Sequence, residues 1–308
     1  MLAIVAPGFC NRSSDRQGRL LCLIHQGLHH QAAGAARPLR HGERIMDLIQ
    51  IASSATLGLF FGMLLFLEIG RRIGLHHLVR EGGLARGVST AEGAVFALLG
   101  LLIAFTFSGA ASRFEDRRHL ITEEANAIGT AYLRLDLLPV TSQPELRTLF
   151  YDYTGLRAQI YHNARDMAAV QQRLDQSIRL QSQIWQHALI AARAPDAPAH
   201  AMMLLVPALN EMIDITTTRW MVTQNHPPLV IFLLLAFLSL MGSLLIGYEM
   251  AENPHRSWLH CVAFACIMSL CIYVIVDMEF PRLGFFTITA ADQVLLDLQA
   301  SMLPDLQK

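Results

Sequence analysis

The sequence is poor in charged residues and contains almost no lysine. Of its 308 residues, 16 % are charged, below the roughly 25 % that is usual for soluble domains. Lys308 is the sole lysine, and we attribute the bias towards arginine to a GC-rich bacterial genome. The formal net charge is −1. Because nucleic-acid binding needs a strongly basic surface, we expect no nucleic-acid partner.

Motifs for catalysis and for cysteine chemistry are also missing. The sequence has no GxGxxG, GxxxxGK[ST], HExxH or GxSxG pattern and no CxxC pair. Cys261, Cys266 and Cys271 lie five residues apart in one apolar run, so a helix would point them in different directions. We interpret them as small packing residues. We expect no metal, no cofactor and no enzymatic activity.

What the chain has instead is four long apolar runs, at residues 48–67, 94–110, 229–248 and 258–276. None of them contains Asp, Glu, Lys or Arg. Their lengths are close to the roughly 20 residues that a helix needs to cross about 30 Å of hydrocarbon. A helix on the surface of a soluble protein would have a polar face, and these runs have none. They predict four transmembrane helices and an integral membrane protein.

The remaining segments predict further helices and no strand, so the expected fold is an all-α membrane protein with a helical extramembrane body between spans 2 and 3. We expect the second span to continue as one long helix to the break at Pro139. Helical spacing continues over residues 145–193 and 199–224, with a break or kink at Pro207. An amphipathic helix at 290–302 is expected to dock on the body. Residues 73–90 are expected to be a loop facing lipid headgroups.

These features divide the chain into five regions. Residues 1–45 are rich in arginine and histidine, and their longest apolar run is too short for a signal peptide. Met46 directly precedes the first membrane run, so we expect residues 1–45 to be a mis-assigned or disordered extension. The other regions are the spans at 46–110, the body at 111–227, the spans at 228–280 and the tail at 281–308.

The second apolar run carries a stripe of small residues with steps of three and four positions, which places them on one face of a helix. Such a face allows close packing between membrane helices. The alternative is a face that lines a pathway or contacts another subunit. The stripe consists of Gly93, Ala97, Gly100, Ala104, Ser108 and Ala111.

Polar residues at helical spacing predict a second kind of site, a polar seam between two helices of the body. One face carries Glu123 and Asn126, and the other carries Asn210, Glu211 and Asp214. The seam is either a structural hydrogen-bond network or a polar lining below a membrane pore. In the second case, nearby arginines would attract anions. The residues that complete this set are Arg113, Arg117, Asp277 and Arg282.

Four stretches of the chain resemble a bacterial family described as bestrophin-like. They are residues 98–114 (LLGLLIAFTFSGAASRF), 123–132 (EEANAIGTAY), 209–214 (LNEMID) with His226-Pro-Pro228, and the exit from the last span at 277–284. The resemblance extends over about residues 46–302. The pattern departs from calcium-responsive bestrophins, because no dense acidic run follows the last span. We therefore expect no gating by calcium.

The resemblance implies a homo-oligomeric anion channel, because bestrophins are pentameric and have four-span subunits with a cytosolic helical body. The partners that it implies are the lipid bilayer of a bacterial inner membrane, further copies of the chain, and chloride or other small anions. It also makes Phe96 and Phe107, three helical turns apart, candidates for a constriction that excludes water; ordinary packing is the alternative. The competing function is a non-conducting scaffold or sensor whose body binds a partner. Arginines are equally frequent on the two sides of the predicted membrane spans, so the positive-inside rule does not settle the orientation of the chain in the membrane.

Overall fold

The structure, a computed structural model, describes residues 41–81, 88–160, 167–252, 258–282 and 284–306. The chain divides into two units, Met1–Ile45 and Met46–Lys308. Most of the first unit lies outside the described residues, so the expectation for residues 1–45 stays a prediction. The second unit carries the spans, the body and the tail.

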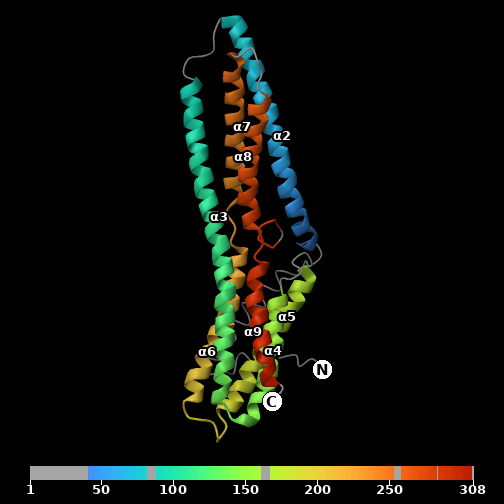
Figure 1. Ribbon diagram of the computed structural model, residues 1–308, viewed down its shortest axis with the longest axis vertical. Helices are drawn as coiled ribbons and strands as arrows, with labels where there is room; N and C mark the ends of the chain where they lie inside the picture. Colours follow the sequence, from blue (N-terminus) through green and yellow to red (C-terminus); the bar gives the residue numbers. More distant parts are fainter. Residues whose placement is uncertain (1–40, 82–87, 161–166, 253–257, 283, 307–308) are drawn as a thin grey trace, which may run out of the picture. The chain divides into compact units, whose positions relative to one another are not determined.

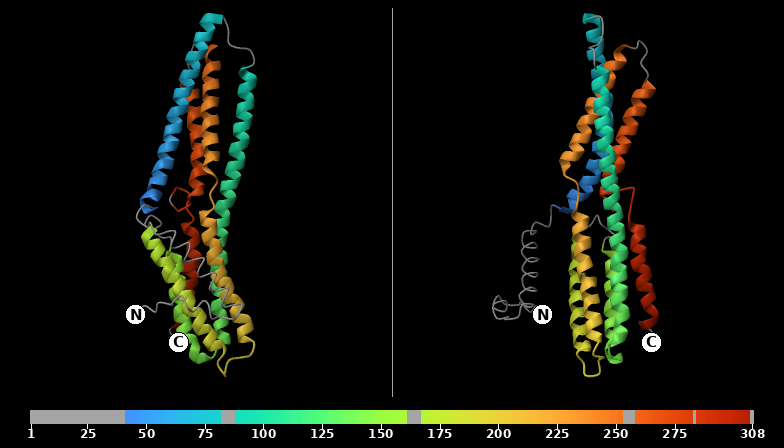
Figure 2. Two further views of the ribbon diagram at one scale, coloured as in Figure 1. Left: turned by 180° about the vertical axis from the view of Figure 1, so that it is seen from behind. Right: turned by 90° about the vertical axis from the view of Figure 1, so that its left-hand side faces the viewer.

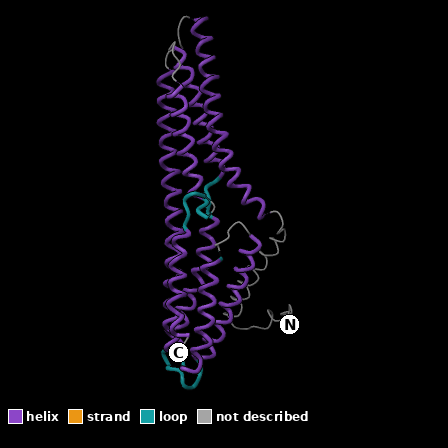
Figure 3. The backbone as a smooth tube through the Cα atoms, turned by 45° about the vertical axis from the view of Figure 1, so that its right-hand side comes forward, coloured by secondary structure: helices purple, strands orange, loops and turns teal. Residues whose placement is uncertain are grey.

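The described residues form helices and connecting loops and contain no strand, which confirms the all-α prediction (Figure 3). The main helices are α2 (His41–Glu81), α3 (Val88–Leu133), α4 (Gln143–Gln159), α5 (Met167–Ala192), α6 (Ala201–Gln224), α7 (Leu229–Glu249), α8 (Trp258–Glu279) and α9 (Thr289–Leu306). Short 3-10 turns lie at Arg134–Leu137, Val140–Ser142 and Met250–Glu252.

Four helical stretches of the described chain are long and apolar enough to cross a membrane, as predicted. Three of them contain a whole apolar run, and the first, Ser53–Arg80, contains residues 53–67 of the run at 48–67. We take these runs as the membrane-spanning parts of α2, α3, α7 and α8. The predicted loop at residues 73–90 was wrong at both ends, because α2 continues to Glu81 and α3 begins at Val88. No helix-breaking proline or glycine pair occurs before Gly82 and Gly83, which lie outside the described residues.

The predicted long helix is confirmed: α3 leaves the apolar region without interruption and continues through the body (Figures 1 and 2). Along its first half it packs against α7 and α8, and along its second half against α6 and α9. Each half has its own hydrophobic core. The membrane core includes Met63, Leu99 and Leu235, and the body core includes Ile128 and Phe150.

The body is a bundle of α4, α5, α6 and α9 around the second half of α3. The helical segment predicted for residues 145–193 is two helices, α4 and α5, and the residues between them, 161–166, lie outside the described part. Pro207 is accommodated inside α6. The tail helix α9 packs against α4, as the sequence predicted, and buries Leu295 and Met302.

Glycines allow α2 and α7 to approach each other closely near the ends of their apolar runs. A Cβ atom on Gly70 would lie 2.0 Å from the Leu244 carbonyl oxygen, and one on Gly247 would lie 2.0 Å from the Leu67 carbonyl oxygen. Both atoms are backbone carbonyl oxygens, so they could not move aside for a Cβ atom as the end of a flexible side chain could. Close backbone contact of this kind supports helix association in lipid, where the hydrophobic effect contributes little.

We therefore expect Gly247→Ala to separate α2 from α7 and to lower the free energy of unfolding by about 1–3 kcal/mol, the range typical of overpacking. Gly58→Ala is the matched control, because a Cβ atom at Gly58 would meet nothing within 4 Å. Thermal unfolding of both variants in the same detergent measures the difference. Equal stability of the two variants would contradict the close contact.

Candidate functional site

The stripe of small residues on α3 faces away from the other helices of the described chain. Ala111 is half-buried, and the other five residues are exposed: Gly93, Ala97, Gly100, Ala104 and Ser108. A Cβ atom on Gly93 or on Gly100 would meet no described atom within 4 Å, apart from its own helix and its chain neighbours. Close packing within the described chain therefore does not explain the exposed part of the stripe, and Gly70 and Gly247 have this role instead.

The two aromatic candidates on α3 lie in different surroundings. Phe96 packs inside the membrane core, where its ring meets Phe264 edge to face with centroids 5.7 Å apart. It also occupies the space that a side chain on Gly242 would need, since a Cβ atom there would lie 2.9 Å from the ring. Phe107, in contrast, is exposed. The structure therefore separates Phe96 from the stripe and leaves Phe107 on the outer surface.

A charged junction joins α3 to the end of α8, just beyond the apolar runs. The Arg113 guanidinium donates to the Glu279 carboxylate through Nε, at 2.8 Å, and through Nη2. Arg117 donates to the Glu279 carbonyl oxygen at 3.1 Å and to the Asn225 carbonyl oxygen at 2.9 Å. His226 Nδ1 lies 3.7 Å from the same carboxylate. The end of α8 and the segment between α6 and α7 are thus held against the middle of α3, around the buried carboxylate of Glu279.

Asp277 builds the turn that follows α8. Its carboxylate accepts the backbone N–H groups of Phe285, at 2.9 Å, and of Phe286, at 2.7 Å. Gly284 is required for this approach, because a Cβ atom there would lie 2.1 Å from Asp277 Oδ1. Asp277 and Arg282, both named in the predicted polar set, therefore bind different groups. Asp277 is buried and holds the backbone.

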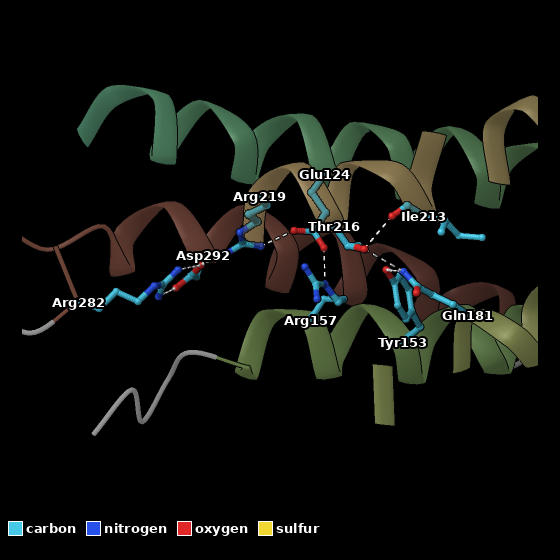
Figure 4. Close-up of polar contacts among 9 residues, drawn as sticks. All are labelled: Glu124, Tyr153, Arg157, Gln181, Ile213, Thr216, Arg219, Arg282 and Asp292. Atoms are coloured by element: carbon cyan, nitrogen blue, oxygen red, sulfur yellow. Dashed lines mark hydrogen bonds and ion pairs between the residues drawn. The ribbon is translucent and has the colours of Figure 1, made fainter. Parts of the chain in front are cut away.

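A second network of charges lies inside the body, and its centre is Glu124 (Figure 4). Glu124, on α3, is fully buried, and each of its carboxylate oxygens accepts a hydrogen bond from a buried arginine. Arg157 comes from α4 and Arg219 from α6. A carboxylate in a dry interior requires such compensation, because an unpaired buried charge is strongly unfavourable. Glu124 therefore holds three helices together.

The network continues to the tail through Asp292 on α9. Arg219 Nη2 lies 3.3 Å from Asp292 Oδ1, and Arg282 binds both oxygens of Asp292, at 2.6 and 3.1 Å (Figure 4). This two-pronged geometry is the strong form of an arginine–carboxylate pair. Because Arg282 directly follows α8, the chain of ion pairs connects the exit of the last span to the centre of the body.

A neutral branch of the network surrounds Tyr153. The Gln181 amide donates to the Tyr153 hydroxyl at 3.0 Å and lies 3.4 Å from Thr216 Oγ1, which itself donates to the Ile213 carbonyl oxygen. Burial raises the pKa of Tyr153 to about 12, so its hydroxyl stays protonated at any physiological pH. This branch connects α4, α5 and α6 without adding charge.

The structure does not bring the predicted seam together. Glu123 and Asn126 on α3, and Asn210, Glu211 and Asp214 on α6, are all exposed. Glu123 instead forms a surface pair with His119, 3.2 Å away. The exposed face of α6 lines a shallow surface groove of about 480 Å³, together with Pro207, Ile215 and Thr218.

Glu123 was the glutamate predicted for a buried network, but Glu124 occupies that position, although the sequence pattern contained the information. Ile121 and Ile128 on α3, and Leu135 in the 3-10 turn that follows it, recur at intervals of seven and are fully buried. Glu124 falls between the first two of them on the same face, whereas Glu123 is rotated by about 100° towards water. The partners Arg157 and Asp292 were also missed, because their proximity depends on how α4 and α9 pack.

These features define an all-α integral membrane protein in which one continuous helix carries both a membrane stripe and a buried body network. Residues 58–292 match the family described as "Bestrophin-like domain", which is most of the chain. The chain therefore belongs to the bestrophin-like family. A comparison with curated proteins finds no match.

Crystal structures of a bacterial bestrophin homologue from Klebsiella pneumoniae have the same fold. One, of a single-residue variant, has a TM-score of 0.62 at 14 % identity and covers 80 % of this chain and 98 % of that one. Another, solved by zinc phasing, has a TM-score of 0.57 at 14 % identity, with 78 % and 98 % covered. At this identity the similarity concerns the fold.

Replacing Glu124 by glutamine leaves the Arg157 and Arg219 guanidinium groups without their shared carboxylate in the interior. We expect Glu124→Gln to lower the free energy of unfolding by about 3–5 kcal/mol, as when one partner of a buried ion pair is removed. Glu123→Gln, at the exposed neighbour, should change it by less than about 0.5 kcal/mol. Denaturant unfolding followed by helical circular dichroism compares them, and similar values would contradict the buried network.

Proposed function

We propose that this protein is the subunit of an oligomeric anion channel in a bacterial inner membrane, with the small-residue stripe of α3 facing the pore. The observation that carries this proposal is the exposure of the stripe. A membrane helix gains nothing from a continuous row of glycine, alanine and serine that faces lipid. Facing other copies of α3, the same row leaves room for ions and lets the helices approach.

Membership of the bestrophin-like family supports the channel, since bestrophins are anion channels. The junction between α3 and α8 does not decide the sign of the permeant ion. Arg113 and Arg117 face the Glu279 carboxylate, and Asp116, next to Arg117 on α3, also acts on that guanidinium, so these four charges balance. Glu115 and Glu123 are further exposed carboxylates on α3. Conduction and ion selectivity therefore need separate measurements.

A scaffold or sensor is the second candidate, and the surface groove on α6 is the observation that favours it. The groove exposes Glu211 and Asp214 beside apolar Pro207 and Ile215, a mixture that suits a protein partner. This function needs no pore, and the outward stripe would then serve subunit contact alone.

Ion flux into liposomes distinguishes the two candidates. We expect the wild-type protein to pass chloride and Gly100→Leu to reduce the flux to near that of empty vesicles, because four added carbons per subunit would narrow the pore. Gly58→Leu is the matched control, since Gly58 is an equally uncrowded glycine on α2. It should leave the flux unchanged.

The reversal potential in a potassium chloride gradient then identifies the permeant ion. A reversal potential with the sign expected for chloride permeation supports the anion channel. The opposite sign would show that cations, and not anions, pass through the pore. Absence of any flux above empty vesicles, for an oligomer that is intact by light scattering, would favour the scaffold.

A further inference from the structure

A pocket on the outer surface of the membrane region combines an apolar groove with one guanidinium group. It has a volume of about 250 Å³ and lies between α3 and the beginning of α7. Leu102, Phe105, Ile231, Leu234 and Leu235 line the apolar part, and Thr106, Gly109, Arg113 and Pro227 complete it. The Thr106 hydroxyl donates to its own helix at the Leu102 carbonyl, so the groove contributes no polar group of its own.

The pocket extends from the hydrocarbon region to its boundary. The apolar run of α3 ends at residue 110, and that of α7 begins at Leu229, directly after the two prolines. From Leu102 to Arg113 the helix rises roughly 16 Å, which is about half of the hydrocarbon thickness. The apolar part of the groove therefore lies at the depth of the acyl chains of one leaflet, and Arg113 at the depth of their headgroups.

An exposed aromatic turn marks the same level independently. Phe285 is 82 % exposed and Phe286 is 41 % exposed, in the turn that Asp277 holds at the end of α8. Glu279, two residues from Asp277, binds Arg113, so this turn and the charged end of the pocket lie close to one depth. Phenyl rings exposed at this point are stable in the boundary of a bilayer rather than in water.

The charge at this end of the pocket is suited to an anion. Arg113 binds Glu279 through Nε and Nη2, and its Nη1 lies beside Gly109, where a Cβ atom would be only 3.2 Å away. Arg113 lines the pocket and is half-buried rather than enclosed. Arg117 is buried beside it and is balanced by Glu279 and Asp116, so Arg113 is the guanidinium that the pocket offers to a ligand.

We propose that this pocket binds an anionic phospholipid, with the phosphate at Arg113 and one acyl chain in the groove between α3 and α7. The groove opens on the outer surface, since Phe105 is 66 % and Leu234 is 43 % exposed. It is small for a drug-sized ligand, whereas a single hydrocarbon chain needs only a narrow channel. The bound lipid would join α3 to α7 across the break at residues 225–228, beside the junction that already ties them to α8.

Native mass spectrometry of the detergent-purified full chain tests this site. The protein is equilibrated with equal amounts of phosphatidylglycerol and phosphatidylcholine that have the same acyl chains, and the lipid retained per subunit is counted. We expect about a fivefold preference for phosphatidylglycerol, the effect of one arginine near an anionic headgroup. Because no ion gradient is involved, the result is independent of whether the protein conducts.

Two variants of the pocket should remove the preference: Leu234→Trp, which fills the groove, and Arg113→Gln, which removes the charge. Leu234→Trp leaves the buried pair with Glu279 intact, so the test holds even where Arg113→Gln does not fold. The matched controls are Leu233→Trp, at an exposed neighbouring position outside the pocket, and Arg118→Gln, at an exposed arginine on α3. Both controls should retain the preference.

Equal retention of the two lipids by the wild-type protein would overturn the site. A preference that survives both pocket variants, or that Leu233→Trp also removes, would indicate unspecific lipid around the helices and would overturn it as well. Displacement of the lipid by excess inorganic phosphate would identify free phosphate as the ligand instead. A change of oligomer size by Leu234→Trp, with an unchanged lipid ratio, would show that a second copy of the chain fills the groove.

Discussion

The structure depends on the continuity of α3 across two solvents. Lipid offers no hydrogen-bond partners to a backbone, so a segment that crosses it must satisfy its own N–H and C=O groups as a helix. Beyond the hydrocarbon this requirement ends, and most proteins turn there. This chain has no proline or glycine pair at that point, and α3 continues into the body as one rigid element. Both hydrophobic cores are therefore built against the same helix.

The two halves of α3 lie in different surroundings. In the membrane one exposed face of α3 carries the stripe of small side chains, and no other helix of the described chain covers it. In the body its buried face carries Glu124, whose charge is compensated by Arg157 and Arg219. Removing these charges from water is costly, so the network contributes to stability mainly by penalising any arrangement that separates them.

Ion pairs also connect the two regions. Glu279 and Asp277 lie two residues apart at the end of α8, and one binds α3 while the other holds the turn that leads to α9. Arg282 then joins this turn to Asp292 and, through Arg219, to Glu124. A displacement of α8 would therefore be transmitted to the body through these ion pairs. Such a route is a feature that either a gated pore or a membrane sensor can use.

The sequence by itself determined the four spans, the all-helical class, the long α3 and the docking of the tail helix, because hydrophobic run length and helical spacing are local properties. It also located the small-residue stripe, but it did not say which way the stripe faces. Tertiary structure alone decided that Gly70 and Gly247 make the close contact, that Glu124 rather than Glu123 is buried, and that Arg113 and Arg117 turn towards Glu279. These outcomes depend on residues far apart in the chain, and a helical pattern specifies a face without specifying what covers it.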